Sequence, residues 1–194
     1  MPEEGIETQE LKERLEDDQE QEHPPQLRWL TWLSLSTAIL AVIAAISSLE
    51  SGAYANDAIV QKDDAILHQS KADDGWAYYQ AKGIEKTVYA TQARLASDPA
   101  LGAEWRASAE REDVDRLEIR RKAEDNEKAV DEWNEKSEHS LHLHHQFARS
   151  VTTLQVAIAL AAIAALARRK FAWWVSLAVG AVGAVFFVVG LLAG

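Results

Sequence analysis

Hydrophobic side chains gather in three long runs, and a strongly polar segment separates the first run from the other two. Residues 29–49, 150–167 and 171–193 hold no charged side chain apart from those at their borders. At about 1.5 Å per residue, a helix of roughly 20 residues spans the ~30 Å hydrocarbon core of a membrane. The pattern therefore predicts three transmembrane helices, which occupy residues 27–50, 146–167 and 171–194.

The polar segment, residues 51–145, has helical spacing and one strong break. The break is Ser97-Asp98-Pro99, where Asp98 can cap a helix whose first residue is Pro99. We expect two long helices, near residues 54–96 and 99–146, that turn at 97–99 into an antiparallel, coiled-coil-like hairpin. The predicted fold class is all-α, with this hairpin between the first and second spans.

Each predicted hairpin helix carries an apolar stripe at spacings of three and four residues, but polar residues interrupt both stripes. The first stripe includes Ile59 and Ile66. Such thin seams make an isolated hairpin weak, so we expect self-association to bury the aromatic residues. The predicted packing or partner-docking motif is Trp76, Tyr79, Gln80, Gly83, Trp105 and Trp133.

Composition and charge narrow the classes of function. The formal net charge is −11, and a nucleic-acid binder would need a basic surface. The chain contains no cysteine, which excludes a disulfide scaffold. Residues 1–28 hold ten acidic side chains, and so few apolar residues cannot offset the entropy of ordering them. Residues 1–26 are therefore predicted to form an acidic, disordered tail.

A basic turn joins the second and third spans and sets the expected topology. Arg168, Arg169 and Lys170 are the only residues between these spans. By the positive-inside rule they face the cytoplasm, which places the N-terminus in the cytoplasm and the hairpin on the opposite side of the membrane. The chain is therefore expected to be a multi-pass membrane protein.

Four histidines lie within seven residues just before the second span: His139, His142, His144 and His145. On a helix, Glu138, His142 and His145 share a face, and imidazole with carboxylate is a set that transition metals bind. These three are candidate metal ligands, although known metal sites normally draw ligands from more than one element. The interpretation that we favour is that the histidines, Phe147 and Arg149 form a belt at the lipid headgroups, without a bound metal.

Two stretches of the chain carry a family resemblance. The run DDGWAYYQAKGIEK at residues 73–86 is the first, and HLHHQFARSVTTLQVAIALAAIAAL at residues 142–166 is the second. Together with the first span they resemble an uncharacterised bacterial membrane-protein family known as domain of unknown function 4337. The resemblance covers residues 25–194 and implies an architecture of one span, a helical segment and a paired span. It implies no activity, substrate or cofactor.

No nucleophile–base pair, glycine-rich phosphate loop or paired carboxylate in an apolar setting accompanies these motifs, which argues against an enzyme and against a cofactor. We expect a non-enzymatic membrane scaffold or adaptor that forms a homo-oligomer through its hairpin. Its expected partners are the lipid bilayer and an unidentified protein, not nucleic acid. Two alternatives remain, an oligomeric pore or channel and a membrane-bound pH or metal sensor that uses the His139–His145 cluster.

Overall fold

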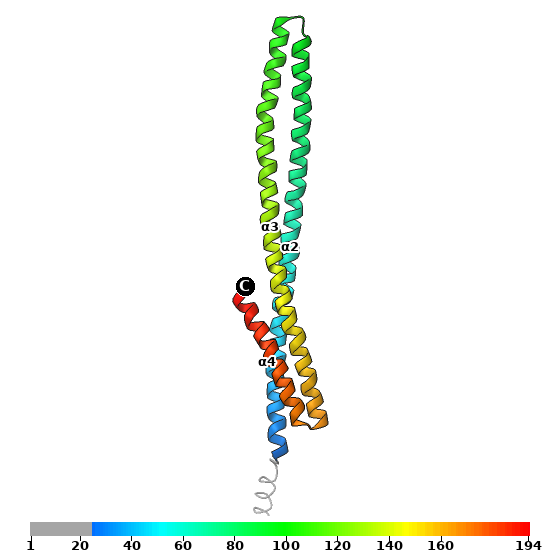
Figure 1. The fold of residues 1–194 in the computed structure, drawn as a ribbon, viewed down its shortest axis with the longest axis vertical. Helices are drawn as coiled ribbons and strands as arrows, with labels where there is room; N and C mark the ends of the chain where they lie inside the picture. The colour runs from blue at the N-terminus through cyan, green and yellow to red at the C-terminus, as the bar shows by residue number, and fades with distance from the viewer. Residues whose placement is uncertain (1–24) are drawn as a thin grey trace, which may run out of the picture. The chain divides into compact units, whose positions relative to one another are not determined.

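The computed structural model describes residues 25–194, and within this range it is all-α with no strand (Figure 1). The predicted acidic tail lies almost wholly outside the described residues. Three long helices make up the described residues, and each contains a stretch long and apolar enough to cross a membrane. Their bounds are α2 at Pro25–Leu95, α3 at Pro99–Ala167 and α4 at Lys170–Ala193. The all-α expectation and the three long apolar helices are confirmed.

Two helices run through positions where the sequence analysis placed boundaries. Helix α2 continues from the first apolar run into the polar segment, and α3 continues from the polar segment into the second apolar run. Neither junction contains a proline, and a change from polar to apolar side chains alters the surroundings of a helix but not its backbone geometry. The first and second predicted spans are therefore each one part of a longer helix, whereas the third corresponds to the whole of α4.

Both connections between helices have a local cause. Helix α3 begins as expected, because the backbone N–H of Ala100 donates to Asp98 Oδ1 at 2.9 Å and Pro99 is the first helical residue. Helix α3 ends at Ala167, because the next residue, Arg168, has a φ of 50° in the left-handed region and cannot continue a right-handed helix. Only two residues then precede α4, so α4 folds back beside α3 (Figure 1).

The described residues divide into two compact units. Residues 25–52 and 143–194 form the first, which we call the apolar unit. Residues 53–142 form the second, which we call the helix pair. Helices α2 and α3 contribute to both units, and α4 belongs to the apolar unit alone.

Glycines bring α4 close to its neighbours in the apolar unit. A Cβ atom added at Gly180 would lie 2.8 Å from Leu40, and one added at Gly183 would lie 2.8 Å from Leu154. Such distances are too short for carbon atoms in contact. The absence of a side chain at these positions therefore lets the helix surfaces meet.

Serine hydroxyls supply the polar contacts inside the apolar unit. Ser47 and Ser150 lie 3.1 Å apart through their Oγ atoms, and Ser150 donates to the carbonyl oxygen of Gly183 at 2.9 Å. Ser176 donates to the carbonyl oxygen of Ala157 at 2.7 Å. All three serines are buried, and buried polar groups need such partners. The hydroxyls thus connect all three helices.

Phe147 departs from the sequence interpretation. We expected it beside Arg149 in a belt at the lipid headgroups, but its side chain is 0% exposed. Its ring packs on Phe187 with a centroid distance of 6.1 Å, and Gly190 leaves the space that the ring fills. The glycine on α4, which lies more than 40 residues away in the sequence, decides this burial.

The seam of the helix pair is made of small residues. Buried alanines recur every seven residues on α2, at Ala58, Ala65 and Ala72, and Ala109 and Ala123 are buried on α3. At Gly75 an added Cβ would lie 3.0 Å from the Cβ of Ala123. Ile59 and Ile66, expected in this seam, are instead each 60% exposed. Alanine and glycine allow the two helices to approach more closely than isoleucine would, and this selects the alanine face.

We expect Gly183→Ala to destabilise the chain, because the new methyl group would overlap Leu154 in a packed interface. Overpacking of this kind costs about 1–3 kcal/mol. Gly52→Ala is the matched control, since no described atom outside its own stretch of helix lies within 4 Å of its added Cβ. That change should leave the free energy of unfolding unchanged or raise it by up to about 1 kcal/mol, because alanine has a higher helix propensity than glycine. Thermal unfolding of both variants in detergent, followed by circular dichroism, measures the difference, and equal midpoints would contradict the packing.

Candidate functional site

The motif at residues 73–86 faces α3 within the helix pair, and Arg116 of α3 lies over it. The guanidinium carbon of Arg116 is 4.2 Å from the centroid of the Tyr79 ring, a cation–π arrangement. A Cβ added at Gly83 would lie 3.2 Å from the same guanidinium. Gly83 and the Tyr79 ring thus form a flat surface on α2, against which Arg116 of α3 packs.

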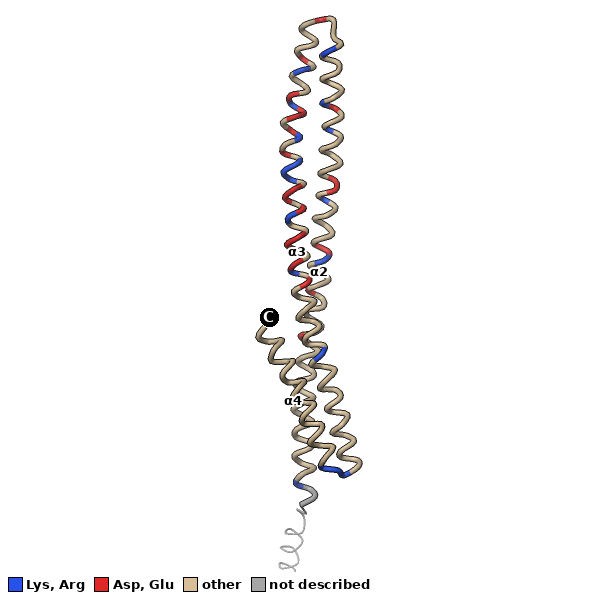
Figure 2. The backbone as a smooth tube through the Cα atoms, in the orientation of Figure 1, with Lys and Arg blue, Asp and Glu red and all other residues tan. Residues whose placement is uncertain are grey.

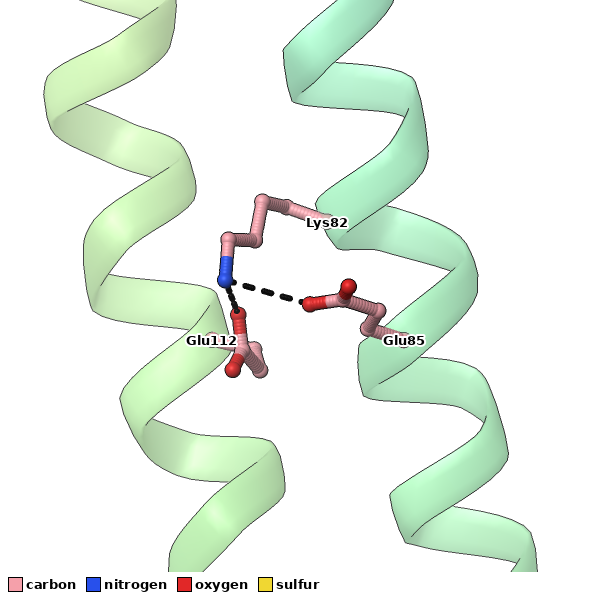
Figure 3. Close-up of polar contacts among 3 residues, drawn as sticks. All are labelled: Lys82, Glu85 and Glu112. Carbon is pink, nitrogen blue, oxygen red and sulfur yellow. Dashed lines mark hydrogen bonds and ion pairs between the residues drawn. The ribbon is translucent and has the colours of Figure 1, made fainter.

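Charged side chains near this arginine pair with one another. Lys82 Nζ lies 2.7 Å from Glu112 Oε2 and 3.1 Å from Glu85 Oε2 (Figure 3). Lys86 Nζ lies 2.6 Å from Asp113 Oδ1. We call these residues the ionic cluster: Lys82, Glu85, Lys86, Glu112, Asp113 and Arg116.

The pairing shifts the protonation equilibria in the ionic cluster. The hydrogen bonds that Lys82 donates to Glu112 and then to Glu85 raise the pKa of Lys82 above its usual range. The hydrogen bond from Lys86, followed by the charges of Lys86 and Arg116, lowers the pKa of Asp113. Both shifts favour the charged forms at neutral pH. Three cations then balance three anions, so the cluster joins α2 to α3 and has no net charge with which to attract a ligand.

The predicted aromatic residues find partners within the chain. Trp76 Nε1 donates to Glu127 Oε1 at 2.8 Å, and its ring meets Tyr79 edge-on at 5.6 Å. The Trp105 ring stacks on Tyr89 at 5.5 Å. Lys136 Nζ lies 4.1 Å above the Trp133 ring. All three tryptophans are half-buried in the single chain.

Gln80 is exposed and borders a shallow groove beside the ionic cluster. The groove has a volume of about 570 Å³. Its lining residues are Gln80, Gly83, Ile84, Thr87, Val88 and Arg116. The structure therefore brings together Trp76, Tyr79, Gln80 and Gly83 of the predicted motif, whereas Trp105 and Trp133 lie elsewhere along α3.

The structure does not assemble the candidate metal ligands. Glu138, His142 and His145 are all exposed. Within residues 25–194, no group of three or more His, Cys, Asp or Glu side chains is placed to hold a metal ion.

His144 makes the interhelical contact that the sequence analysis did not single out. Its Nδ1 lies 2.8 Å from the carbonyl oxygen of Ser51, so this nitrogen carries a hydrogen and donates. Ser51 Oγ lies 3.0 Å from the same nitrogen and donates to the carbonyl oxygen of His144 at 3.3 Å. The sequence contains one signal for this contact. Ser51 lies seven residues before Ala58, which places it on the same face of α2 as the buried alanines.

The basic turn predicted to set the topology is exposed. Arg168, Arg169 and Lys170 lie at the connection from α3 to α4, and all three side chains reach the surface. Among the described residues none of the three forms a salt bridge.

We expect the stability of the helix pair to fall on acidification, partly through Asp113. Because its pKa is lowered in the folded chain, Asp113 stabilises the fold above its unfolded pKa, about 3.9, and this contribution is lost as pH falls through the lower folded value. Asp113→Asn should therefore flatten the fall in melting temperature between neutral pH and about pH 3. Asp131→Asn is the control, since Asp131 is exposed and has no salt bridge among residues 25–194. If Asp113→Asn kept the full pH dependence of the melting temperature, Asp113 would not contribute to the loss of stability in acid.

Comparison with known proteins places the chain in a family. No curated protein and no solved structure matches it. One family model does match, over residues 29–193, which include all of the apolar unit after Arg28 except Gly194, and the whole helix pair. The chain therefore belongs to the family described as domain of unknown function (DUF4337).

Proposed function

We propose that the chain is an integral membrane scaffold that self-associates through its helix pair. The membrane placement is supported by the outer surface of the apolar unit. Large apolar side chains cover that surface on all three helices, among them Leu49, Leu166 and Phe171, each at least 70% exposed. Water would solvate such a surface poorly, whereas lipid tails cover it without cost.

In this proposal the helix pair lies outside the hydrocarbon core, because it is the part of the chain that carries the charges. The unpaired basic turn, Arg168, Arg169 and Lys170, faces the cytoplasm by the positive-inside rule. With three spans, the N-terminus is then cytoplasmic and the helix pair lies on the opposite side of the membrane, the periplasmic side of a bacterial inner membrane.

The observation that carries self-association is an exposed apolar stripe on α2. Four of its side chains fall at multiples of seven residues and are each at least 50% exposed. We call them the outer stripe: Val60, Leu67, Val88 and Leu95. Ile59, Ile66 and Ile84, which are also exposed, flank it. Between Leu67 and Val88 the same register holds Asp74 and Ala81, so the stripe consists of two apolar pairs. Apolar side chains seven residues apart are the pattern with which one helix packs along another.

The charge distribution supports a second copy of α2 as the partner of the outer stripe. Residues 53–95 carry 11 charged side chains and residues 99–142 carry 21, so α3 is the more highly charged helix of the pair (Figure 2). The same stripe on another copy has apolar side chains at the same four positions and therefore the same spacing. A twofold symmetric dimer pairs identical surfaces in this way. The charges of the ionic cluster pair with one another within one chain. The outer stripe is therefore the surface of the helix pair that a second copy would cover.

Placing acids in the outer stripe should disrupt the oligomer. Leu67→Glu with Val88→Glu would bury two unpaired carboxylates at the interface, which costs several kcal/mol and raises the dissociation concentration more than about tenfold. The matched control is Ala107→Glu, which adds one acid at an exposed site of α3. Light scattering of the full chain in detergent gives the number of copies, and circular dichroism checks that helicity is kept. An unchanged copy number in the double variant, or equal loss in the control, would refute the interface.

The proposed topology predicts the behaviour of reporter fusions. A reporter that is active only outside the cytoplasm, inserted after Ser97 in the turn of the helix pair, should be active, and a cytoplasmic reporter at the same site should be silent. Replacing all three basic residues of the α3–α4 turn with glutamine should reduce this asymmetry, because the positive charge is what retains the turn inside. A cytoplasmic reporter that is active after Ser97 in the native chain would reverse the assignment.

A further inference from the structure

A second groove lies in the apolar unit, between α3 and α4, and has a volume of about 510 Å³. Its lining residues are His145, Ala148, Arg149, Thr152, Thr153 and Phe186. His145 and Arg149 are one helical turn apart on α3, and both are exposed. Phe186 comes from α4. The groove thus has a cationic end and an apolar wall on the neighbouring helix.

The positive charge of this groove is uncompensated, in contrast to the ionic cluster. Arg149 forms no salt bridge with another residue of the described range. It is also the last charged residue on α3, because residues 150–167 have none. A guanidinium at this point stands where the helix changes from polar to apolar surroundings. Its five N–H donors in a planar fork match the oxygens of a phosphate.

Toward Phe186 the groove loses its hydrogen-bond donors. The hydroxyl of Thr152 donates to the carbonyl oxygen of Ala148 at 2.9 Å, and that of Thr153 donates to the carbonyl oxygen of Arg149 at 2.8 Å. Both hydroxyl hydrogens are therefore used within α3. The methyl groups of these threonines, Ala148 and the Phe186 ring suit a hydrocarbon chain better than a polar one.

We propose that this groove binds an anionic phospholipid. Its phosphate contacts Arg149 and His145, and one acyl chain lies along Phe186. Basic pockets between membrane helices recognise anionic lipid headgroups by this combination. The inference rests on the membrane placement of the apolar unit under the proposed function, and it adds a ligand class and a site. Inorganic phosphate shares the headgroup chemistry but cannot use the apolar wall.

The test is native mass spectrometry of the full chain in detergent, titrated separately with phosphatidylglycerol, phosphatidylcholine and inorganic phosphate. We expect phosphatidylglycerol to be retained at one per chain, with affinity about tenfold above that of phosphatidylcholine. Arg149→Gln should lower the phosphatidylglycerol affinity about tenfold through loss of a charge-assisted contact. Phe186→Ala should weaken lipid binding and leave any binding of inorganic phosphate unchanged.

Arg169→Gln is the matched control, because Arg169 is an exposed arginine in the same unit but outside the groove. Equal loss of lipid in Arg149→Gln and Arg169→Gln would overturn the site in favour of bulk charge attraction. Equal affinity for the two lipids, or displacement of the lipid by an equal concentration of inorganic phosphate, would also overturn it. Before these titrations, the chain is reconstituted into vesicles and the vesicles are extracted with carbonate. Release of the chain would refute the membrane placement itself. Retention of the chain, followed by equal binding of the two lipids, would refute only the lipid site in the groove.

Discussion

Close approach of helix backbones through small residues is the constraint on which both units of this protein depend. In the apolar unit, Gly180 and Gly183 leave room for leucines of the other two helices. In the helix pair, Gly75 faces Ala123 at a distance that admits no larger side chain. Under the proposed membrane placement, the helices of the apolar unit gain little from hydrophobic burial. Dispersion contacts and interhelical hydrogen bonds must then stabilise their packing, and both need short distances.

The small residues at the contact between α2 and α3 determine which side chains of α2 are exposed. Alanine and glycine fill the contact between α2 and α3, so the large apolar residues of α2 remain on its outer face. Ile59 and Ile66 illustrate this displacement, since each is 60% exposed while the neighbouring Ala58 and Ala65 are buried. The outer stripe that supports the proposed self-association therefore follows from the same packing that holds the single chain together.

The two units differ in whether their charged side chains are paired. Within the helix pair, lysines and arginines meet acids at salt-bridge distance, and the ionic cluster has no net charge. Such contacts contribute little stability at an exposed surface but fix which residues of two helices lie opposite one another. In the apolar unit, Arg149 and the basic turn lack ion pairs with any residue from 25 to 194. Among these cations, Arg149 is the one that lines the groove proposed to bind a lipid phosphate.

The sequence alone determined the all-α class, the three apolar stretches, the Asp98–Pro99 helix start and the family, because each depends on local composition, spacing or capping. Tertiary structure decided which face of each helix is buried, since a spacing of three and four residues fits both the alanine face and the isoleucine face of α2. It also decided that Phe147 is buried, because Gly190 of α4 makes the space. The His144–Ser51 contact likewise depends on the register between two helices, which residues 93 positions apart in the chain cannot specify by local pattern.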